Sequence, residues 1–334
     1  MNYQKTFILF IIFILSTIIL FVWDLGVGSV NIGFNDVIST IAGKSSNHLN
    51  SQIILNIRLN KAIVALLSGA ALSVSGLQMQ TLFRNPLAGP YVLGISSGAS
   101  LGVALFILGM PIIGLSASSL PFGIAGSAWI GSAVILILIG LLSQRINDIM
   151  VILILGMMFS SGISAVVQVL QYLSHDDALK SFVIWTMGSL GEVTSFQLPV
   201  LFGGVFLGLL IAVITVKPLN QLTLGEEYAL TMGLNIRRSR SMLFLSTTLL
   251  AGTVTAFCGP IGFIGLAIPH VTRMIFNCAD HRILIPANIL TGASILILCD
   301  IISKIWLLPI NAITSLLGIP VIVFVVIRNK SFAS

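Results

Sequence analysis

The histidines and cysteines are the residues of this chain that could most readily bind a metal or act as nucleophiles. They are His48, His175, His270, His281, Cys258, Cys278 and Cys299. The cysteines form no CxxC pair, and the histidines do not recur at the spacing of a zinc site. The spacing therefore predicts no metal site, no disulfide framework and no catalytic residue. A weak alternative is a membrane enzyme, because Asp280, His281 and His270 flank one predicted inner turn.

One short segment resembles part of a nucleotide-binding motif. Gly43-Lys44-Ser45 could end a phosphate-binding loop, but Ile38 stands where the first glycine of that loop belongs. No strand is predicted before it. The sequence therefore predicts that this chain binds no nucleotide or other cofactor, and that any ATP is hydrolysed by another subunit.

Composition indicates what must surround these residues. The chain has 334 residues, of which 57% are hydrophobic and only 8% are charged, with a mean hydropathy of +1.09. A soluble domain carries about 25% charged residues. Because so few charges cannot cover a surface in water, lipid must cover it. We predict an all-α polytopic membrane protein with a single transmembrane domain over residues 1–334.

Apolar segments long enough to cross about 30 Å of hydrocarbon recur along the chain. The predicted spans number about ten and lie near 7–24, 60–82, 92–108, 122–142, 149–170, 197–216, 240–258, 260–270, 283–303 and 314–328. The segment 260–270 is too short to cross lipid alone, and its Gly and Pro residues leave backbone groups unpaired. Such backbone is tolerated only inside protein or along a cavity, so we place it within the bundle.

The basic residues predict how the chain is oriented in the membrane. With a cytoplasmic N-terminus, eleven of the sixteen Lys and Arg residues lie in inner connections, and the C-terminus is also cytoplasmic. The five outer ones are Lys44, Arg58, Lys61, Lys180 and Lys304. Because the charge is spread over short connections, the pI near 9.5 does not indicate nucleic-acid binding. The longest outer segment covers about 171–196.

Two predicted spans carry small or polar residues at helical spacing. Gly94, Gly98 and Gly102 form a ridge on the third span that favours close helix packing. On the fifth span, Ser160, Ser164 and Gln168 share one face. This face is either a packing surface with local hydroxyl hydrogen bonds or a polar strip along a translocation pathway.

Acidic residues are absent from the middle of every predicted span. Asp24, Asp148 and Asp300 are all near span ends. We therefore expect the chain to lack buried ionisable groups. Because ion-driven carriers usually need such groups, its energy should come from elsewhere. An ion-coupled secondary transporter is therefore a distant alternative, and a purely structural membrane protein is disfavoured only by the motifs described next.

The inner connection at about 217–240 is the longest on that side and predicts a short helix. Acidic residues begin this helix, basic residues follow it, and Gly233 is placed to cap its C-terminus. It carries Leu224, Tyr228, Leu230 and Met232. These apolar side chains fit either a helix that inserts into a partner's groove or an ordinary solvated loop.

A resemblance decides between these readings. LGEEYALTMGL, from Leu224, resembles the coupling segment of the ferric-siderophore, haem and vitamin B12 importer permeases, which are ten-span subunits of ATP-binding-cassette systems. The similarity extends over Ile57–Gly102, Gly259–Arg273, Asp280–Lys304 and Leu316–Phe324. The chain departs from the family pattern at Gly89, at Arg58–Lys61 and at Leu308–Asn311, which affects details of the outer surface and not the expected fold.

The resemblance implies a complex of two permease chains, as a homodimer or with a related permease, and two ATPase subunits that hold ATP and Mg. A periplasmic or lipid-anchored binding protein would deliver the cargo at a bacterial cytoplasmic membrane. The cargo is a ferric siderophore or, as alternatives, haem or vitamin B12.

The resemblance also implies roles for individual residues. Contact with the ATPase is expected from Leu224, Gly225, Glu226, Glu227, Ala229, Gly233, Arg237 and Arg238. Docking of the binding protein is expected at Arg58, Lys61 and Lys304, which match family positions where arginines receive acidic residues.

Overall fold

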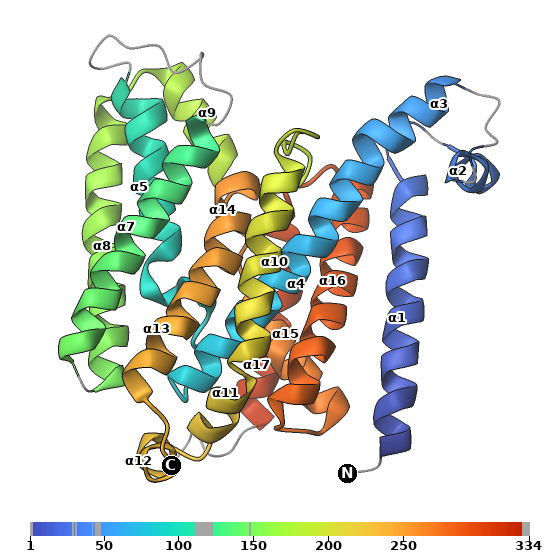
Figure 1. Ribbon diagram of the computed structural model, residues 1–334. Helices are drawn as coiled ribbons and strands as arrows, with labels where there is room; N and C mark the ends of the chain where they lie inside the picture. The colour runs from blue at the N-terminus through green and yellow to red at the C-terminus, as the bar shows by residue number, and fades with distance from the viewer. Residues whose placement is uncertain are drawn as a thin grey trace.

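The computed structural model describes residues 3–28, 30, 32–41, 43, 48–110, 123–146 and 148–328. Lys44 and Ser45 of the nucleotide-like segment lie outside these residues. The described part of the chain is helical and contains no β-strand. Its helices run roughly parallel or antiparallel in one bundle, with α1 at one edge and α8 at the other (Figure 1).

The predicted spans correspond to the long helices of the structure. They are α1 (Tyr3–Gly26), α4 (Leu59–Leu82), α5 (Ile95–Ala104), α7 (Gly123–Arg145), α8 (Ile149–Leu173), α10 (Leu198–Ile214), α13 (Ile236–Thr247), α14 (Thr253–Cys258), α15 (Ile264–Phe276), α16 (His281–Trp306) and α17 (Ile310–Arg328). A π-helical turn joins α13 and α14 into one span. Within the described residues, six spans are long and apolar enough to cross a membrane, α10 with the bent α11 makes a seventh, and three apolar helices are shorter. The prediction of about ten membrane helices is thus confirmed.

Helix α4 forms the centre of the bundle. Every side chain from Leu67 to Leu82 is buried, although the segment contains many Ser, Gly and Ala residues. Their small volume lets other helices approach closely, and their hydroxyls form bonds between helices. Ser73 Oγ, for example, donates to the carbonyl of Asn288 in α16 at 2.7 Å. The Gln78 amide donates to Ser246 in α13 at 3.0 Å.

The glycine ridge of α5 faces α7. A Cβ atom at Gly98 would lie 2.5 Å from the carbonyl oxygen of Gly131, and one at Gly102 would lie 2.0 Å from that of Ser127. Both distances are too short for a side chain, so these positions require glycine. Gly94 instead approaches α8, where its Cβ would lie 3.1 Å from Ser160 Oγ.

The short segment 260–270 covers the turn before α15 and the first half of that helix, and most of its residues are buried, as predicted. A Cβ at its Gly265 would overlap Pro90 and the backbone of α4. Helix α15 therefore begins inside the bundle, against the centre of α4. The sequence did not indicate the short outer helices α2 (Phe34–Ile41), α3 (His48–Gln52) and α9 (Asp176–Thr186).

The two ends of the bundle carry different elements. The start of α1 lies at the same end as α11 (Val216–Leu222) and α12 (Glu226–Thr231), whereas α3 and α9 lie at the opposite end (Figure 1). We call the end with α12 the inner end and the other the outer end, following the positive-inside rule.

Candidate functional sites at the two ends and in the membrane

The predicted inner helix is α12, and a partly buried ion pair fixes it to the bundle. Both oxygens of the Glu226 carboxylate accept from Arg240 Nη2 at 2.7 Å. Arg240 in α13 is only 2% exposed and also donates to the carbonyl of Ile146 at 3.3 Å. Because a two-point pair fixes orientation as well as distance, Glu226 holds the start of α12 in one position.

Two glycines set the ends of α12. Gly225 precedes the helix with φ of +109°, a conformation that other residues adopt only with strain. Gly233 follows it with φ of +80°, and its N–H donates to Leu230 while that of Leu234 donates to Ala229. This pair of bonds is a Schellman cap, so Gly233 closes the helix as predicted.

The outward side of α12 is apolar, although it lies in the inner connection. Ala229 is buried against the bundle, while Leu224, Tyr228, Leu230 and Met232 are 60%, 67%, 58% and 46% exposed. Glu227, Arg237 and Arg238 are also exposed around it. An exposed apolar patch with a charged rim indicates a contact surface for another protein.

A polar network connects this region to the membrane helices. The backbone N–H of His281 donates to Asn220 Oδ1 in α11 at 2.8 Å, and the imidazole Nδ1 lies at the same distance from that oxygen. The other imidazole nitrogen lies 2.9 Å from Thr81 Oγ1 in α4. Asn220 also donates to Asp280 at 2.7 Å. One asparagine therefore links α11, just before α12, to α4 and α16.

Asp280 and His281 are thus structural partners in this network. The Asp280 carboxylate caps α16 by accepting the N–H of Arg282 at 2.9 Å, and this bond is the main cause that lowers the pKa of Asp280. The sequence indicated that both residues lie at one inner turn. It could not show that their partner is Asn220, which is some 60 residues away.

The outer end contains a buried charge cluster that the sequence analysis missed. Asp24 and Asp300 are both 0% exposed. Lys304 Nζ lies 2.7 Å from Asp24 and 2.9 Å from Asp300, and Lys61 Nζ lies 2.9 Å from Asp300. The expectation that the chain lacks buried ionisable groups is therefore wrong.

The reason is that further structure covers these span ends. An apolar cluster formed by Leu25, Ile32, Val37, Ile54 and Ala62 packs the α1–α2 region against the start of α4. Two carboxylates and two ammonium groups then neutralise one another inside the cluster. A hydropathy profile places Asp24 and Asp300 near span ends but cannot show this cover.

Arg58, one of the three predicted docking residues, is also directed into the fold. It is 5% exposed and donates to the carbonyls of Leu25 at 2.9 Å and Gly26 at 2.7 Å, and to that of Val30. The predicted docking residues Arg58, Lys61 and Lys304 are thus all engaged within the chain in this conformation. Their proposed contact with a binding protein stays a prediction.

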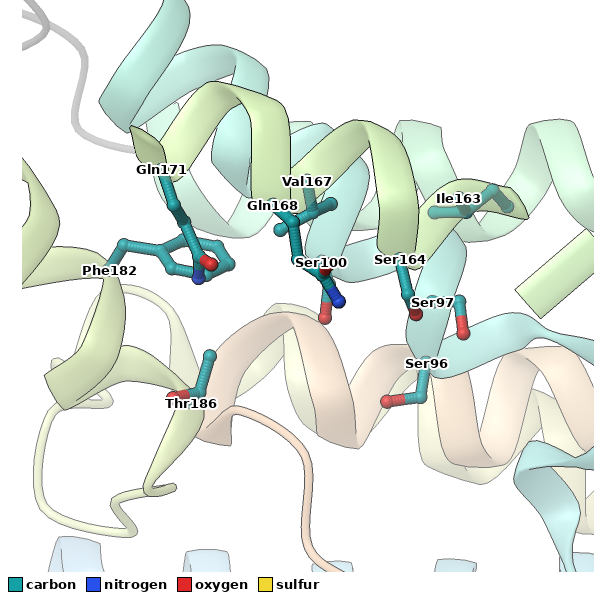
Figure 2. Close-up of a pocket in the computed structure, with 10 residues that line it drawn as sticks. All are labelled: Ser96, Ser97, Ser100, Ile163, Ser164, Val167, Gln168, Gln171, Phe182 and Thr186. Carbon is teal, nitrogen blue, oxygen red and sulfur yellow. The ribbon is translucent and has the colours of Figure 1, made fainter. Parts of the chain in front are cut away.

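The polar face of α8 borders a cavity. Ser160 and Ser164 donate to carbonyls of their own helix at 2.9 and 2.8 Å, which is the local bonding that the packing interpretation expects. Ser164 and Gln168 also line a cavity of about 260 Å³ between α5, α8 and α9, whereas Ser160 lies outside its lining (Figure 2). The structure therefore brings together two of the three pathway candidates with residues of α5 that the sequence analysis did not select.

Comparison with known proteins identifies the class of molecule in which these features occur. The model of the FecCD transport family matches residues 14–328. The chain belongs to the FecCD transport family. Its membership explains the helix arrangement and the long ordered similarity found in the sequence.

Individual relatives match nearly the whole FecCD chain. The hemin transport system permease protein HmuU of Yersinia pestis is 38% identical over 312 residues, covering 92% of each chain. The vitamin B12 import system permease protein BtuC of Escherichia coli strain HS is 36% identical over 283 residues, covering 82% of this chain and 83% of the relative. A solved metal-chelate type ABC transporter in an inward-facing conformation is 30% identical, with a TM-score of 0.84 and coverage of 96% and 99%.

Proposed function

We propose that this FecCD protein is the membrane-spanning permease subunit of an ATP-binding-cassette importer for a metal chelate, in a bacterial cytoplasmic membrane. It would work as a homodimer with two separate ATPase subunits, which bind ATP and Mg. An extracytoplasmic binding protein would deliver the cargo. The relatives named for hemin and vitamin B12 transport support the cargo class.

The observation that carries this proposal is the surface around α12. Leu224, just before α12, and Tyr228 and Leu230 within it are more than half exposed, and Glu226 fixes this helix in place. A firmly held helix with an apolar outer face can transmit movement from a partner protein bound to that face. Closure of the ATPases would thereby move the inner ends of the helices and bias a two-state pathway.

The network at Asn220 and His281 offers a route for this movement. It joins α11, which precedes α12, to α4 at the centre of the bundle and to α16. A displacement of α12 would therefore reach helices that extend to the outer end. No covalent chemistry by this chain is needed.

The test of the proposal is reconstitution with the ATPase and binding protein in vesicles. We expect ATP-dependent uptake that requires all three components, and loss of the ATPase from the purified complex when Tyr228 and Leu230 are both changed to Asp. Changing the exposed Tyr172 to Asp, at the outer end of α8, is the matched control and should leave ATPase recovery unchanged. Uptake without the ATPase would contradict the proposal.

A ferric siderophore is the cargo that we propose, because siderophores form the broadest cargo class of such permeases. Haem is the second candidate, supported by the Yersinia pestis relative, and vitamin B12 is the third. Uptake of a ferric siderophore, haem and cobalamin by the same vesicles separates the three.

A further inference from the structure

The cavity between α5, α8 and α9 has a chemically distinctive lining. Seven of its ten lining residues carry a hydroxyl or carboxamide group, and none carries a charge. Six of the seven are Ser96, Ser97, Ser100, Ser164, Gln168 and Gln171. Within a membrane span, so many polar groups beside one space are costly unless water or a ligand satisfies their hydrogen bonds.

The geometry of α5 and α8 explains why there is space between them. The helices approach closely near the N-terminus of α5, where a Cβ at Gly156 would lie 2.6 Å from the carbonyl oxygen of Val92. Farther along, α9 packs beside α5 through Phe182, which is buried among residues that include Ala99 and Val103. The three helices therefore enclose the cavity on three sides, with Phe182 forming part of its wall.

The serines on α5 differ from those on α8 in their bonding. Ser160 and Ser164 direct their hydroxyl protons to carbonyls of their own helix. No hydrogen bond within the described part of the chain uses the side chains of Ser96, Ser97, Ser100 or Gln168. Figure 2 shows Gln168 and Ser164 directed toward the serines of α5. These groups are therefore available to donate to or accept from a ligand.

From this arrangement we infer that the cavity is a cargo-binding subsite for a neutral metal chelate whose surface carries amide, hydroxamate or hydroxyl groups. The inference rests on the proposed function and deepens it by naming the chemical class of cargo. A ligand with free carboxylates or phenolates would bring negative charge to a space whose lining offers no cation, and unpaired charges are costly there. A neutral periphery can exchange hydrogen bonds with the serines and Gln168 at little cost.

The test measures binding directly in lipid nanodiscs that contain the permease with its ATPase but no binding protein. The probes are a neutral ferric trihydroxamate and a polyanionic ferric tris-catecholate. Trp185 serves as the reporter because its ring lies 6.1 Å from that of Phe182 between centroids. We expect the trihydroxamate to quench tryptophan fluorescence saturably, and this quenching to be much smaller in Trp185→Phe. The affinity for the tris-catecholate should be at least about tenfold lower than that for the trihydroxamate.

Variants of the lining connect this signal to the cavity. Gln168→Leu and the double change of Ser97 and Ser100 to Ala should each weaken trihydroxamate binding by about two- to tenfold, as expected for lost hydrogen bonds. Ser161→Ala is the matched control on α8, because Ser161 is exposed, bonds its own helix and does not line the cavity. Gln168→Lys should reverse the preference and favour the tris-catecholate.

The outcomes separate the subsite from the proposed function. ATP-dependent uptake with equal chelate binding by wild type and lining variants would overturn the subsite alone, as would equal affinity for the two probes. Chelate binding that the lining variants weaken, in a complex that shows no ATP-dependent uptake, would overturn the proposed function and support the subsite.

Discussion

The outer and inner ends of this FecCD protein use charged residues in opposite ways. At the outer end, Asp24 and Asp300 are fully enclosed with Lys304 between them. At the inner end, Glu227 and Arg237 are exposed beside an apolar helix face. Both ends of the bundle carry basic residues next to span ends, so residue types do not distinguish the two ends. The burial of the charges and their pairing within the chain do distinguish them.

This difference indicates which end depends on a partner. The outer charges neutralise one another within one chain and hold both α1 and α4 to α16. Only one charged pair, Glu226 with Arg240, does the same around α12 in the described residues. We expect the exposed charges and apolar side chains around α12 to acquire partners when another subunit binds. Changes at the outer end should therefore act on stability, and changes at the inner end on coupling.

The largest effect is expected for Lys304→Glu. This change would place a third carboxylate between Asp24 and Asp300, whose side chains are both fully buried. Uncompensated buried charge costs several kcal/mol per ion, so we expect a loss above about 5 kcal/mol and almost no folded protein. Size-exclusion chromatography in detergent gives the measurement, and Lys180→Glu, on the exposed outer helix α9, is the control.

The same variant also tests the predicted docking of a binding protein. A folded Lys304→Glu protein that binds its partner slowly at low salt but normally at high salt would show that Lys304 is a docking residue. Complementary rim charges act mainly on association rate, and salt screens them. That result would break the contrast between the two ends.

A smaller loss of stability is expected for Asp300→Ala. It leaves the ammonium groups of Lys61 and Lys304 with less compensating charge, although Asp24 still pairs with Lys304. We expect a loss of about 3 kcal/mol, at the lower end for a broken buried pair, because the side chain of Lys61 is 22% exposed. Thermal unfolding in detergent measures it. Asp177→Ala in the first turn of α9 is the control, and equal shifts for the two variants would contradict a structural role of the cluster.

The sequence was informative where structure depends on local pattern. The length of the apolar segments predicted the membrane spans, and Gly233 predicted the end of α12. It was uninformative where structure depends on distant pairing. Lys304 and Asp24 are 280 positions apart, and nothing local to either residue signals the other.

The candidate site shows the same division. Ser164 and Gln168 could be selected because they share one face of a regular helix. Ser96, Ser97 and Ser100 were missed because they adjoin the glycine ridge, whose packing explained that segment without reference to a cavity. The cavity exists only because α9 folds back beside α5, and the sequence did not predict α9.

A moderate effect at the inner end is expected for Glu226→Lys. The new ammonium group would face the buried guanidinium of Arg240, which now donates hydrogen bonds to both oxygens of this carboxylate. Hydrogen bonds to charged groups contribute about 1.5–3 kcal/mol, so α12 should detach and stability should fall by about that amount. Transport should fall more than the ATPase rate in reconstituted vesicles. The charge-restoring double variant Glu226→Lys with Arg240→Glu should recover part of both.

The smallest effect, and the sharpest test of the comparison, is expected for Glu227→Lys. Glu227 is the neighbour of Glu226 in the first turn of α12, but it is exposed and outside the ion pair with Arg240. Its reversal should leave thermal unfolding unchanged apart from the few tenths of a kcal/mol that an acidic residue contributes at a helix N-terminus. If the inner end is a docking surface, the same change should weaken ATPase binding by about 0.2–1 kcal/mol, which is less than about sixfold, with a salt dependence typical of exposed pairs. Affinity of the purified ATPase for permease nanodiscs at low and high salt measures this, with Glu226→Lys beside it. Because the two glutamates are adjacent, a matching loss of stability in both variants would show that the charges of α12 serve its own fold, and that the inner end resembles the outer one after all.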